Sequence, residues 1–410
     1  MEEKRAVKTK QFDRVLLITT MALLFVGAVM VYSTTSIVAP SKGGGAAVSA
    51  SLIDLRYLKK HLVSIVLGIV LMVGFYKLRL GVLKRYAFIL LGFAACLLIA
   101  VKMPYIGLTV NGARRWIRIV HFTFQPSEPA KLVLIVFLAR YLSDKSFNPE
   151  SFKSFIKPIV LMGTLQGLLL LQPDFGSSVI IGIITFSMLF VARVKIKFIL
   201  SLGILLIPVV IKLIMKPYRL QRIMVFLDPW ADERNTGFQL IQSFVAFGTG
   251  GLNGLGVGKS AQKLFFLPEA KTDFIFSIVG EEIGFIGATV VVILFMILFI
   301  RAALITLRQK EPYLYYLACG ITMLIGVQAL LNLSVVCGLL PTKGLPLPFI
   351  SYGGTSMIMN LIEIGILLNL AKGESEEEGS VSPHVDIYSG MREKIMRPRG
   401  RVLSDVKWKA

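Results

Sequence analysis

Cysteine and histidine are scarce in this sequence. The 410 residues include three of each, scattered along the chain without the spacing of a zinc site. They are Cys96, Cys319, Cys337, His61, His121 and His384. Because the cysteines lie in apolar runs, we expect buried thiols rather than disulfides. The sequence therefore predicts neither a zinc centre nor a disulfide framework.

Charged residues are also few. They make up 17% of the chain against 55% hydrophobic residues, and the mean hydropathy is +0.73, whereas soluble proteins average about 25% charged and about 45–50% apolar. The apolar residues form long blocks, and a bilayer core about 30 Å thick needs about 20 apolar residues per helix. Because lipid offers the backbone no hydrogen bonds, blocks of this length span as helices. We therefore predict an all-α polytopic membrane protein.

We predict about ten membrane-spanning helices. Their ranges are 15–35, 61–77, 86–103, 129–143, 157–172, 177–193, 197–215, 275–301, 313–337 and 350–371. The first run is long and lacks a convincing cleavage site, so we expect a retained helix rather than a signal peptide. The longest connection, 216–274, follows the seventh span and is predicted to be extracytoplasmic.

The orientation follows from the excess of basic residues, which gives a net charge of +21. Nucleic acid is one partner for such a charge, but in membrane proteins Lys and Arg gather in cytoplasmic loops. The N-terminal tail and the connections after spans two, six and eight are basic, which places both termini in the cytoplasm. We predict a tail at 1–14, a membrane domain at 15–372 and a disordered tail at 373–410, which is acidic first and basic last.

The glycine-rich stretch GTGGLNGLGVGKS, residues 248–260, resembles a phosphate-binding loop of nucleotide hydrolases. That motif requires Gly, four residues, then Gly-Lys-Ser, so residue 253 should be glycine, and it is Asn253. The stretch also falls in the outer loop, where ATP is not supplied. We expect its glycines to let an irregular backbone fold close to a cavity at the membrane surface.

Arginines occur where the topology rule predicts few. The outer loop at 104–128 contains Arg114, Arg115 and Arg118 beside Trp116. Long outer loops disregard the charge bias, which accounts for the cations of 216–274 but poorly for this shorter loop. Because guanidinium groups bind phosphate in a bidentate way, the pattern predicts an anionic ligand such as a phosphate.

The strongest candidate acid is Asp273, at the start of the eighth span. An aspartate at the edge of apolar surface is either used, paired, or an N-cap of the helix, and the residues alone leave these alternatives open. We expect Glu281 and Glu282, deeper in the span, to pair internally or line a polar path. Glu128 and Lys131 share one helix face, as a structural ion pair or as ligands. Asp174, in a Pro-Asp-Phe-Gly turn, is interpreted as a helix cap.

Several motifs together resemble the SEDS family (shape, elongation, division and sporulation). They are NGARRWIRI, FQPSEPAK, LLQPDFG, LPEAKTDFIFSIVGEEIGFIG and PTKGLPLPFISYGGTS, and the resemblance covers residues 12–372. The last two are closer to the division branch than to the elongation branch, with the sporulation branch also close. The chain departs from the family at Lys271, where histidine is common, so a histidine relay there is not available.

The resemblance implies a peptidoglycan glycosyltransferase that polymerises lipid II at the outer face of the cytoplasmic membrane, at the division septum. The family's essential acid matches Asp273. The substrate-binding residues expected from the outer charges are Arg114, Arg115, Arg118, Glu128, Lys131, Arg219 and Lys343. A divalent cation, Mg or Mn, is allowed as a cofactor, although no carboxylate cluster supplies protein ligands. The expected partners are lipid II, undecaprenyl-pyrophosphate-linked glycan, a class B penicillin-binding protein and other divisome proteins, but no nucleic acid.

Two alternatives belong to other functional classes. A lipid II flippase would also have about ten spans and intramembrane charges, but it should carry polar groups through the whole depth of the membrane. A scaffold would use the C-terminal tail to recruit division proteins. An elongation or sporulation role with the same polymerase chemistry also stays open.

Overall fold

The computed structural model describes residues 13–35, 46–110, 112–119, 122–233, 237–263 and 267–377. The predictions for the N-terminal tail before residue 13 and for the C-terminal tail after residue 377 lie outside these residues. The predicted boundary at 373 falls inside a helix, because the backbone of the last helix continues to Glu377.

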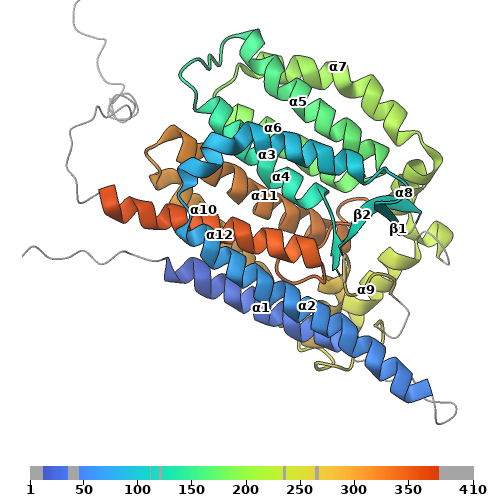
Figure 1. Ribbon diagram of the computed structural model, residues 1–410. Helices are drawn as coiled ribbons and strands as arrows, with labels where there is room; N and C mark the ends of the chain where they lie inside the picture. Colours follow the sequence, from blue (N-terminus) through green and yellow to red (C-terminus); the bar gives the residue numbers. More distant parts are fainter. Residues whose placement is uncertain are drawn as a thin grey trace, which may run out of the picture.

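Each of the ten predicted spans coincides with a helix (Figure 1). These helices are α1 (Arg14–Thr35), α2 (Ala46–Lys77), α3 (Leu80–Ala100), α4 (Ser127–Leu142), α5 (Phe152–Leu171), α6 (Phe175–Val191), α7 (Ile196–Ile214), α10 (Ile275–Arg308), α11 (Pro312–Val336) and α12 (Gly354–Glu377). Most ends agree within a few residues. Helix α2 begins 15 residues earlier than predicted, because its first turns carry too many polar residues to read as a span.

Seven of these helices are long and apolar enough to cross a membrane, among the described residues. Helix α6 and the first part of α7 are apolar but shorter, and α4 contains three charged side chains. The chain is therefore a multi-pass helical membrane protein, and the count of ten spans stays a prediction.

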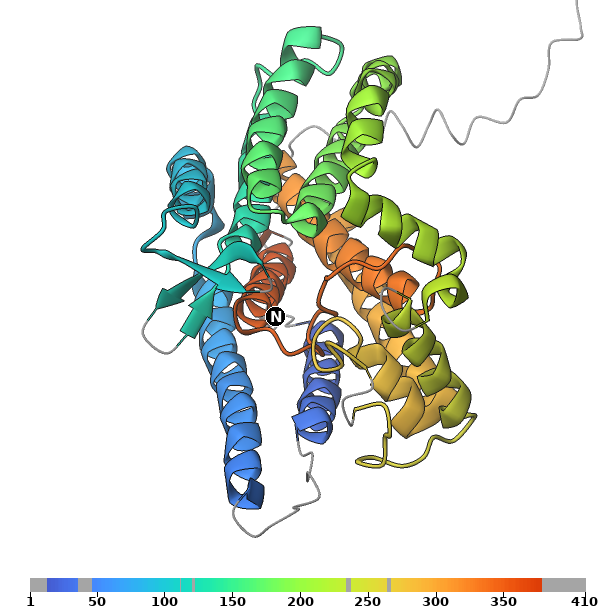
Figure 2. The same cartoon turned by 90° about the vertical axis from the view of Figure 1, so that its right-hand side faces the viewer.

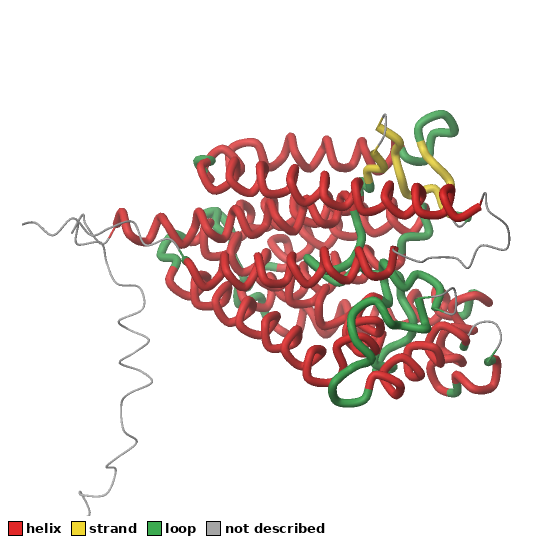
Figure 3. The backbone as a smooth tube through the Cα atoms, turned by 90° about the horizontal axis from the view of Figure 1, so that it is seen from below, coloured by secondary structure: helices red, strands yellow, loops and turns green. Residues whose placement is uncertain are grey.

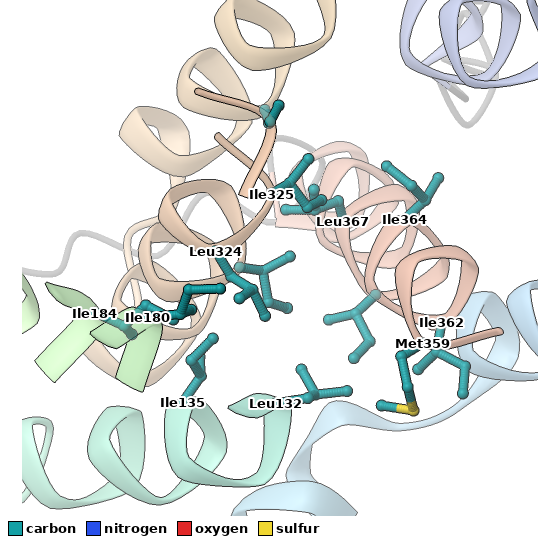
Figure 4. Packing of buried hydrophobic residues seen from close by; sticks show 14 of the residues in the cluster. Leu132, Ile135, Ile180, Ile184, Leu324, Ile325, Met359, Ile362, Ile364 and Leu367 are labelled. Carbon is teal, nitrogen blue, oxygen red and sulfur yellow. The ribbon is translucent and has the colours of Figure 1, made fainter. Parts of the chain in front are cut away.

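The centre of the bundle is α12, whose membrane window is 83% buried inside the protein. Side chains from α4 and α11 pack toward it, and those of α6 pack against α4 and α11 (Figure 4). Small residues allow the closest approach: a Cβ on Gly365 of α12 would lie 2.5 Å from the carbonyl oxygen of Met72 in α2. In a membrane, where apolar burial drives helix association weakly, such close backbone packing is what holds two helices together.

The predicted outer loop 104–128 contains a three-stranded antiparallel sheet that the sequence analysis missed. Its strands are β1 (Gly107–Val110), β2 (Ala113–Ile119) and β3 (Phe122–Phe124). The long connection 216–274 is also structured, with α8 (Pro217–Leu227), the short helix η1 (Pro229–Asp232) and α9 (Phe238–Gly250). The strands and the long loops gather at one end of the bundle (Figure 3).

Helix α10 is interrupted after its first nine residues. Gly284 has φ +75° and ψ −173°, outside the helical region. The backbone of the glycine-rich loop after α9 lies against this break, and a Cβ on Gly284 would meet the nitrogen of Gly254 at 2.3 Å. Glycine is required here by both the conformation and the contact. The break separates the turns that follow Asp273 from the rest of the span.

Candidate active site

Asp273 lies on the loop immediately before α10. The amide of Asn332 in α11 donates to the carbonyl of Asp273 at 2.8 Å and to the carbonyl of Leu345 at 2.6 Å. Gly344, in the loop that also contains Leu345, lies so close that a Cβ there would be 2.9 Å from Oδ2 of Asp273. The buried amide of Asn332 therefore holds the backbone at Asp273 against the loop that contains Gly344 and Leu345.

The carboxylate of Asp273 does not cap α10. The N-cap position is Phe274, with no side-chain capping bond, and no group in the described ranges donates a hydrogen bond to the Asp273 carboxylate. Asp174 behaves in the opposite way, because its Oδ1 accepts from the backbone N–H of Ser177 at 3.1 Å and caps α6. The N-cap alternative thus applies to Asp174 and not to Asp273.

The environment of Asp273 disfavours its ionised form. Burial raises the pKa of Asp273 from 3.8 to about 7, and the nearby Glu269 carboxylate acts in the same direction. Arg222 and Arg115 oppose this by lowering the pKa. A carboxylate with a pKa near neutrality, partly enclosed and close enough to two guanidinium groups to feel their charge, has the properties of a general base.

Three cationic side chains lie around the corner between α5 and α6, which we define as residues 172–175. From the sheet, Arg115 donates through Nε to the carbonyl of Gln172 at 3.2 Å and through Nη2 to that of Pro173 at 2.6 Å. From the other side, Arg219 and Lys343 each lie 4.6 Å from the centre of the Phe175 ring. Burial lowers the pKa of Lys343 to about 8, while Asp174 raises it. These cations lie around residues 172–175, and Arg115 among them is close enough to Asp273 to lower its pKa.

The three arginines of strand β2 do not form one cluster. The register pairs Thr109 with Arg114 and Leu108 with Trp116, so Arg115 is the extra residue of a β-bulge. Because paired residues share a face and neighbours alternate, Arg114 lies on the Thr109 face and Arg118 on the opposite one. Both are exposed, and Arg114 donates to the Thr109 hydroxyl at 3.1 Å. Only Arg115 is directed to the corner near Asp273.

Glu128 and Lys131 form a buried ion pair at the start of α4. Nζ of Lys131 lies 2.8 Å from Oε1 of Glu128, and the side chains are 2% and 5% exposed. Glu363 of α12 is close enough to interact with both charges. No hydrogen bond or ion pair in the described ranges joins this pair directly to Asp273, so the expected ion pair is confirmed and a ligand role stays a prediction.

The glycine-rich stretch holds carboxylates where a phosphate loop would hold phosphate. The N–H of Ser260 donates to Glu282 Oε1 at 3.3 Å, the N–H of Ala261 donates to Glu281 Oε1 at 2.9 Å, and the Ser260 hydroxyl donates to Glu281. Nζ of Lys263 forms a buried ion pair with Glu282 at 3.1 Å. These amides are occupied by fixed negative charge, which would repel a phosphate.

Several residues at the site were not singled out in the sequence. Arg222 donates to the carbonyl of Thr342 at 3.1 Å and lowers the pKa of Asp273. The ring of Phe175 contacts the cationic groups of Arg219 and Lys343. Glu269 accepts from the Thr272 hydroxyl at 2.7 Å. Arg222 follows Arg219 by three residues, which places both on one side of a helix, and this spacing could have identified Arg222 from the sequence. Lys271, where the family often has histidine, lies 3.8 Å above the Tyr57 ring of α2.

The site offers few ligands for a metal ion. No three His, Cys, Asp or Glu side chains within the described ranges come together to hold one. Asp273 and Glu269 supply two carboxylates, and Mg²⁺ is often held by one or two carboxylates together with substrate phosphates. A divalent cation brought in that way stays a prediction, and no step below depends on it.

Comparisons with known proteins identify the family. Residues 13–376 match the model of the FtsW/RodA/SpoVE family, described as cell cycle proteins. The probable peptidoglycan glycosyltransferase FtsW of Geobacter sulfurreducens is 41% identical, covering 88% of this chain and 95% of its own, and stage V sporulation protein E of Bacillus subtilis is 37% identical, covering 88% and 97%.

The fold is similar to solved structures of the same family. A chain from a peptidoglycan synthase complex, described as coordinating polymerization and crosslinking, superposes with a TM-score of 0.71 at 29% identity, covering 88% of this chain and 98% of that one. The rod shape determining protein RodA of Thermus thermophilus gives a TM-score of 0.61 at 26% identity, covering 88% and 97%. The chain therefore belongs to the FtsW/RodA/SpoVE family, the SEDS family that its motifs predict.

Proposed function

We propose that this protein is a peptidoglycan glycosyltransferase that polymerises lipid II into β-1,4-linked glycan strands during cell division. The name of the Geobacter relative, at 41% identity over most of both chains, supports the activity. The observation that carries the mechanism is the uncapped carboxylate of Asp273, with a pKa of about 7, facing Arg222 and Arg115. Neither Arg114 nor Arg118 is assigned a step in this mechanism, and their predicted substrate binding stays a prediction.

Asp273 acts as the general base. The donor sugar is α-linked to pyrophosphate and the product bond is β, so one displacement inverts the configuration. The 4-hydroxyl oxygen of the acceptor forms the new bond to C1 of the donor, and the bond from C1 to the pyrophosphate oxygen breaks. The hydroxyl proton passes to Asp273. With a pKa of about 7, Asp273 is ionised in a useful fraction at neutral pH and basic enough to accept the proton.

The cations stabilise the leaving group. Negative charge grows on the pyrophosphate as the C1–O bond breaks. Arg115 and Arg222, which act on Asp273, supply positive charge, together with Arg219 and Lys343 beside Phe175. Arg115 and Arg222 are already held by backbone carbonyls. They therefore need little rearrangement when the charge develops, which is the condition under which electrostatic stabilisation is strongest.

The proposal includes a setting for the reaction, which the FtsW name of the Geobacter relative supports. The protein lies in the cytoplasmic membrane with Asp273 on the outer side and acts at the division septum. Its partner is a class B penicillin-binding protein, which crosslinks the strands, together with other divisome proteins. The likeness to a chain of a complex that coordinates polymerization and crosslinking supports this partnership.

Purified protein in detergent with lipid II, with and without the transpeptidase, tests the proposal. We expect glycan strands longer than the disaccharide on a gel, shortened by muramidase digestion. The alternative of a flippase predicts no strands under either condition, together with lipid II transfer across proteoliposomes. That pair of results would overturn the proposal.

A further inference from the structure

Helix α8 and η1 carry an apolar surface that the described part of the protein leaves uncovered. We define the α8 face as Leu220, Met224, Leu227 and Trp230, whose exposed fractions lie between 45% and 71%. The first three are spaced by four and three residues, so they lie on one side of the helix. Uncovered apolar surface of this kind marks an interaction site.

The opposite side of α8 carries cations and faces the protein. Arg219 is buried over the Phe175 ring and Val225 is buried, while Arg222 is exposed overall but donates to the carbonyl of Thr342. An amphipathic helix on a soluble protein turns its apolar side inward and its charges outward. Helix α8 instead buries Arg219 and leaves Leu220, Met224 and Leu227 exposed, which favours an apolar environment on its outer side.

The α8 face continues an apolar surface of α7. Large apolar side chains are exposed along α7, including Ile204, Leu205 and Ile211, and Met215 in the short connection to α8 is 67% exposed. Figure 2 shows α7 and α8 following one another along one edge of the molecule. Since α7 is an apolar helix of a membrane protein, its uncovered side faces lipid. The exposed Met215, with the exposed Lys212 and Lys216 beside it, lies between this side and the α8 face.

We infer that α8 and η1 lie within the membrane leaflet on the Asp273 side, at the boundary between headgroups and acyl chains. The occupant of the α8 face is lipid. Helices that lie in this boundary combine large apolar residues on one side with Lys and Arg on the other, and Trp230 belongs to the residue type enriched there.

This placement brings Arg219 and Arg222 to headgroup depth on the protein side of α8. A lipid-linked anion diffusing in the leaflet can then reach these guanidinium groups laterally, without its chain leaving the acyl region. Identification of that anion as a polyprenyl pyrophosphate rests on the proposed function, whereas the immersion of α8 does not.

Spin labels at single cysteines along α8 test the immersion. Cys96 and Cys337, which are exposed and not buried as predicted, are replaced by serine. Labels are placed singly at Leu220, Gln221, Met224 and Leu227 of the full-length protein. Each variant is reconstituted in nanodiscs of phosphatidylethanolamine and phosphatidylglycerol, and collision rates are measured with oxygen and with a water-soluble nickel chelate. A label at the exposed Asp144, in the short turn after α4, serves as the aqueous reference.

We expect the oxygen-to-nickel ratio at positions 220, 224 and 227 to exceed that at 221 and 144 several-fold. Positions with high oxygen contact should then have low nickel contact, and the reverse, along the helix. Nickel contact at 220, 224 and 227 equal to that at 144 would place α8 in water and overturn the inference. Immobile labels with low contact to both reagents would also overturn it, because a protein would then cover the α8 face. Monodisperse gel filtration of each labelled variant shows that it is folded.

Discussion

The pH dependence of polymerisation offers a quantitative prediction about Asp273. If the pKa of Asp273 is about 7 and only the ionised form accepts the proton, the rate should fall tenfold for each pH unit below 7. At pH 5 the ionised fraction is about 1%, so kcat/KM should be about a hundredfold below its plateau. An aspartate with the ordinary pKa of 3.8 would still be more than about 90% ionised at that pH.

The assay is the initial rate of glycan formation from lipid II in detergent between pH 5 and 8. Protein held at pH 5 and returned to pH 7.5 should regain full activity, which separates titration from unfolding. Glu269→Gln is the matched variant. Because the Glu269 carboxylate raises the pKa of Asp273, its removal should shift the acidic limb of the pH–rate profile to lower pH. A rate that stays flat down to pH 5 in the wild-type protein would refute the reasoning.

Three further predictions concern the surrounding residues. Arg115→Ala should lower kcat/KM by about a hundredfold, the scale for loss of one preorganised donor, whereas Arg118→Ala, on the other face of the bulged strand, should leave it nearly unchanged. Lys263→Ala leaves the Glu282 carboxylate buried without its cation and should destabilise the protein by about 3–5 kcal/mol, seen as an earlier thermal transition in detergent. The raised pKa means that ionised Asp273 destabilises the fold fully above about pH 7 and progressively less as pH falls toward 3.8, so Asp273→Asn should raise the unfolding temperature at pH 8 and less so at pH 5.

The membrane helices could be predicted because their signal is local. Each apolar block is long enough to specify a helix by itself, and the ends follow from charged or proline-containing connections. Where the prediction failed, polar residues masked a helix, as in the first turns of α2. The sheet was missed because its strands are short and interrupted by arginines, so alternation of apolar residues is weak.

The candidate site was predictable only in part, because it depends on contacts between distant segments. Asp273 could be identified from its position before an apolar span and from the family motif. The separation of Arg115 from Arg114 and Arg118 depends on a bulge, which a linear sequence does not reveal. The burial of Arg219 and the contact of Arg222 with the carbonyl of Thr342 depend on how α8 packs against the rest of the protein, whereas apolar periodicity alone would place both arginines outside.

The most direct test of the account compares Asp273→Asn with Asp174→Asn at saturating lipid II. Both changes remove one carboxylate, but Asp174 caps α6 while Asp273 is the proposed base. For correctly folded variants, we expect glycan synthesis to fall by about 10²–10⁴-fold in Asp273→Asn, the contribution of a general base, and by less than about tenfold in Asp174→Asn, because asparagine caps a helix about as well as aspartate. Wild-type turnover by Asp273→Asn would contradict it.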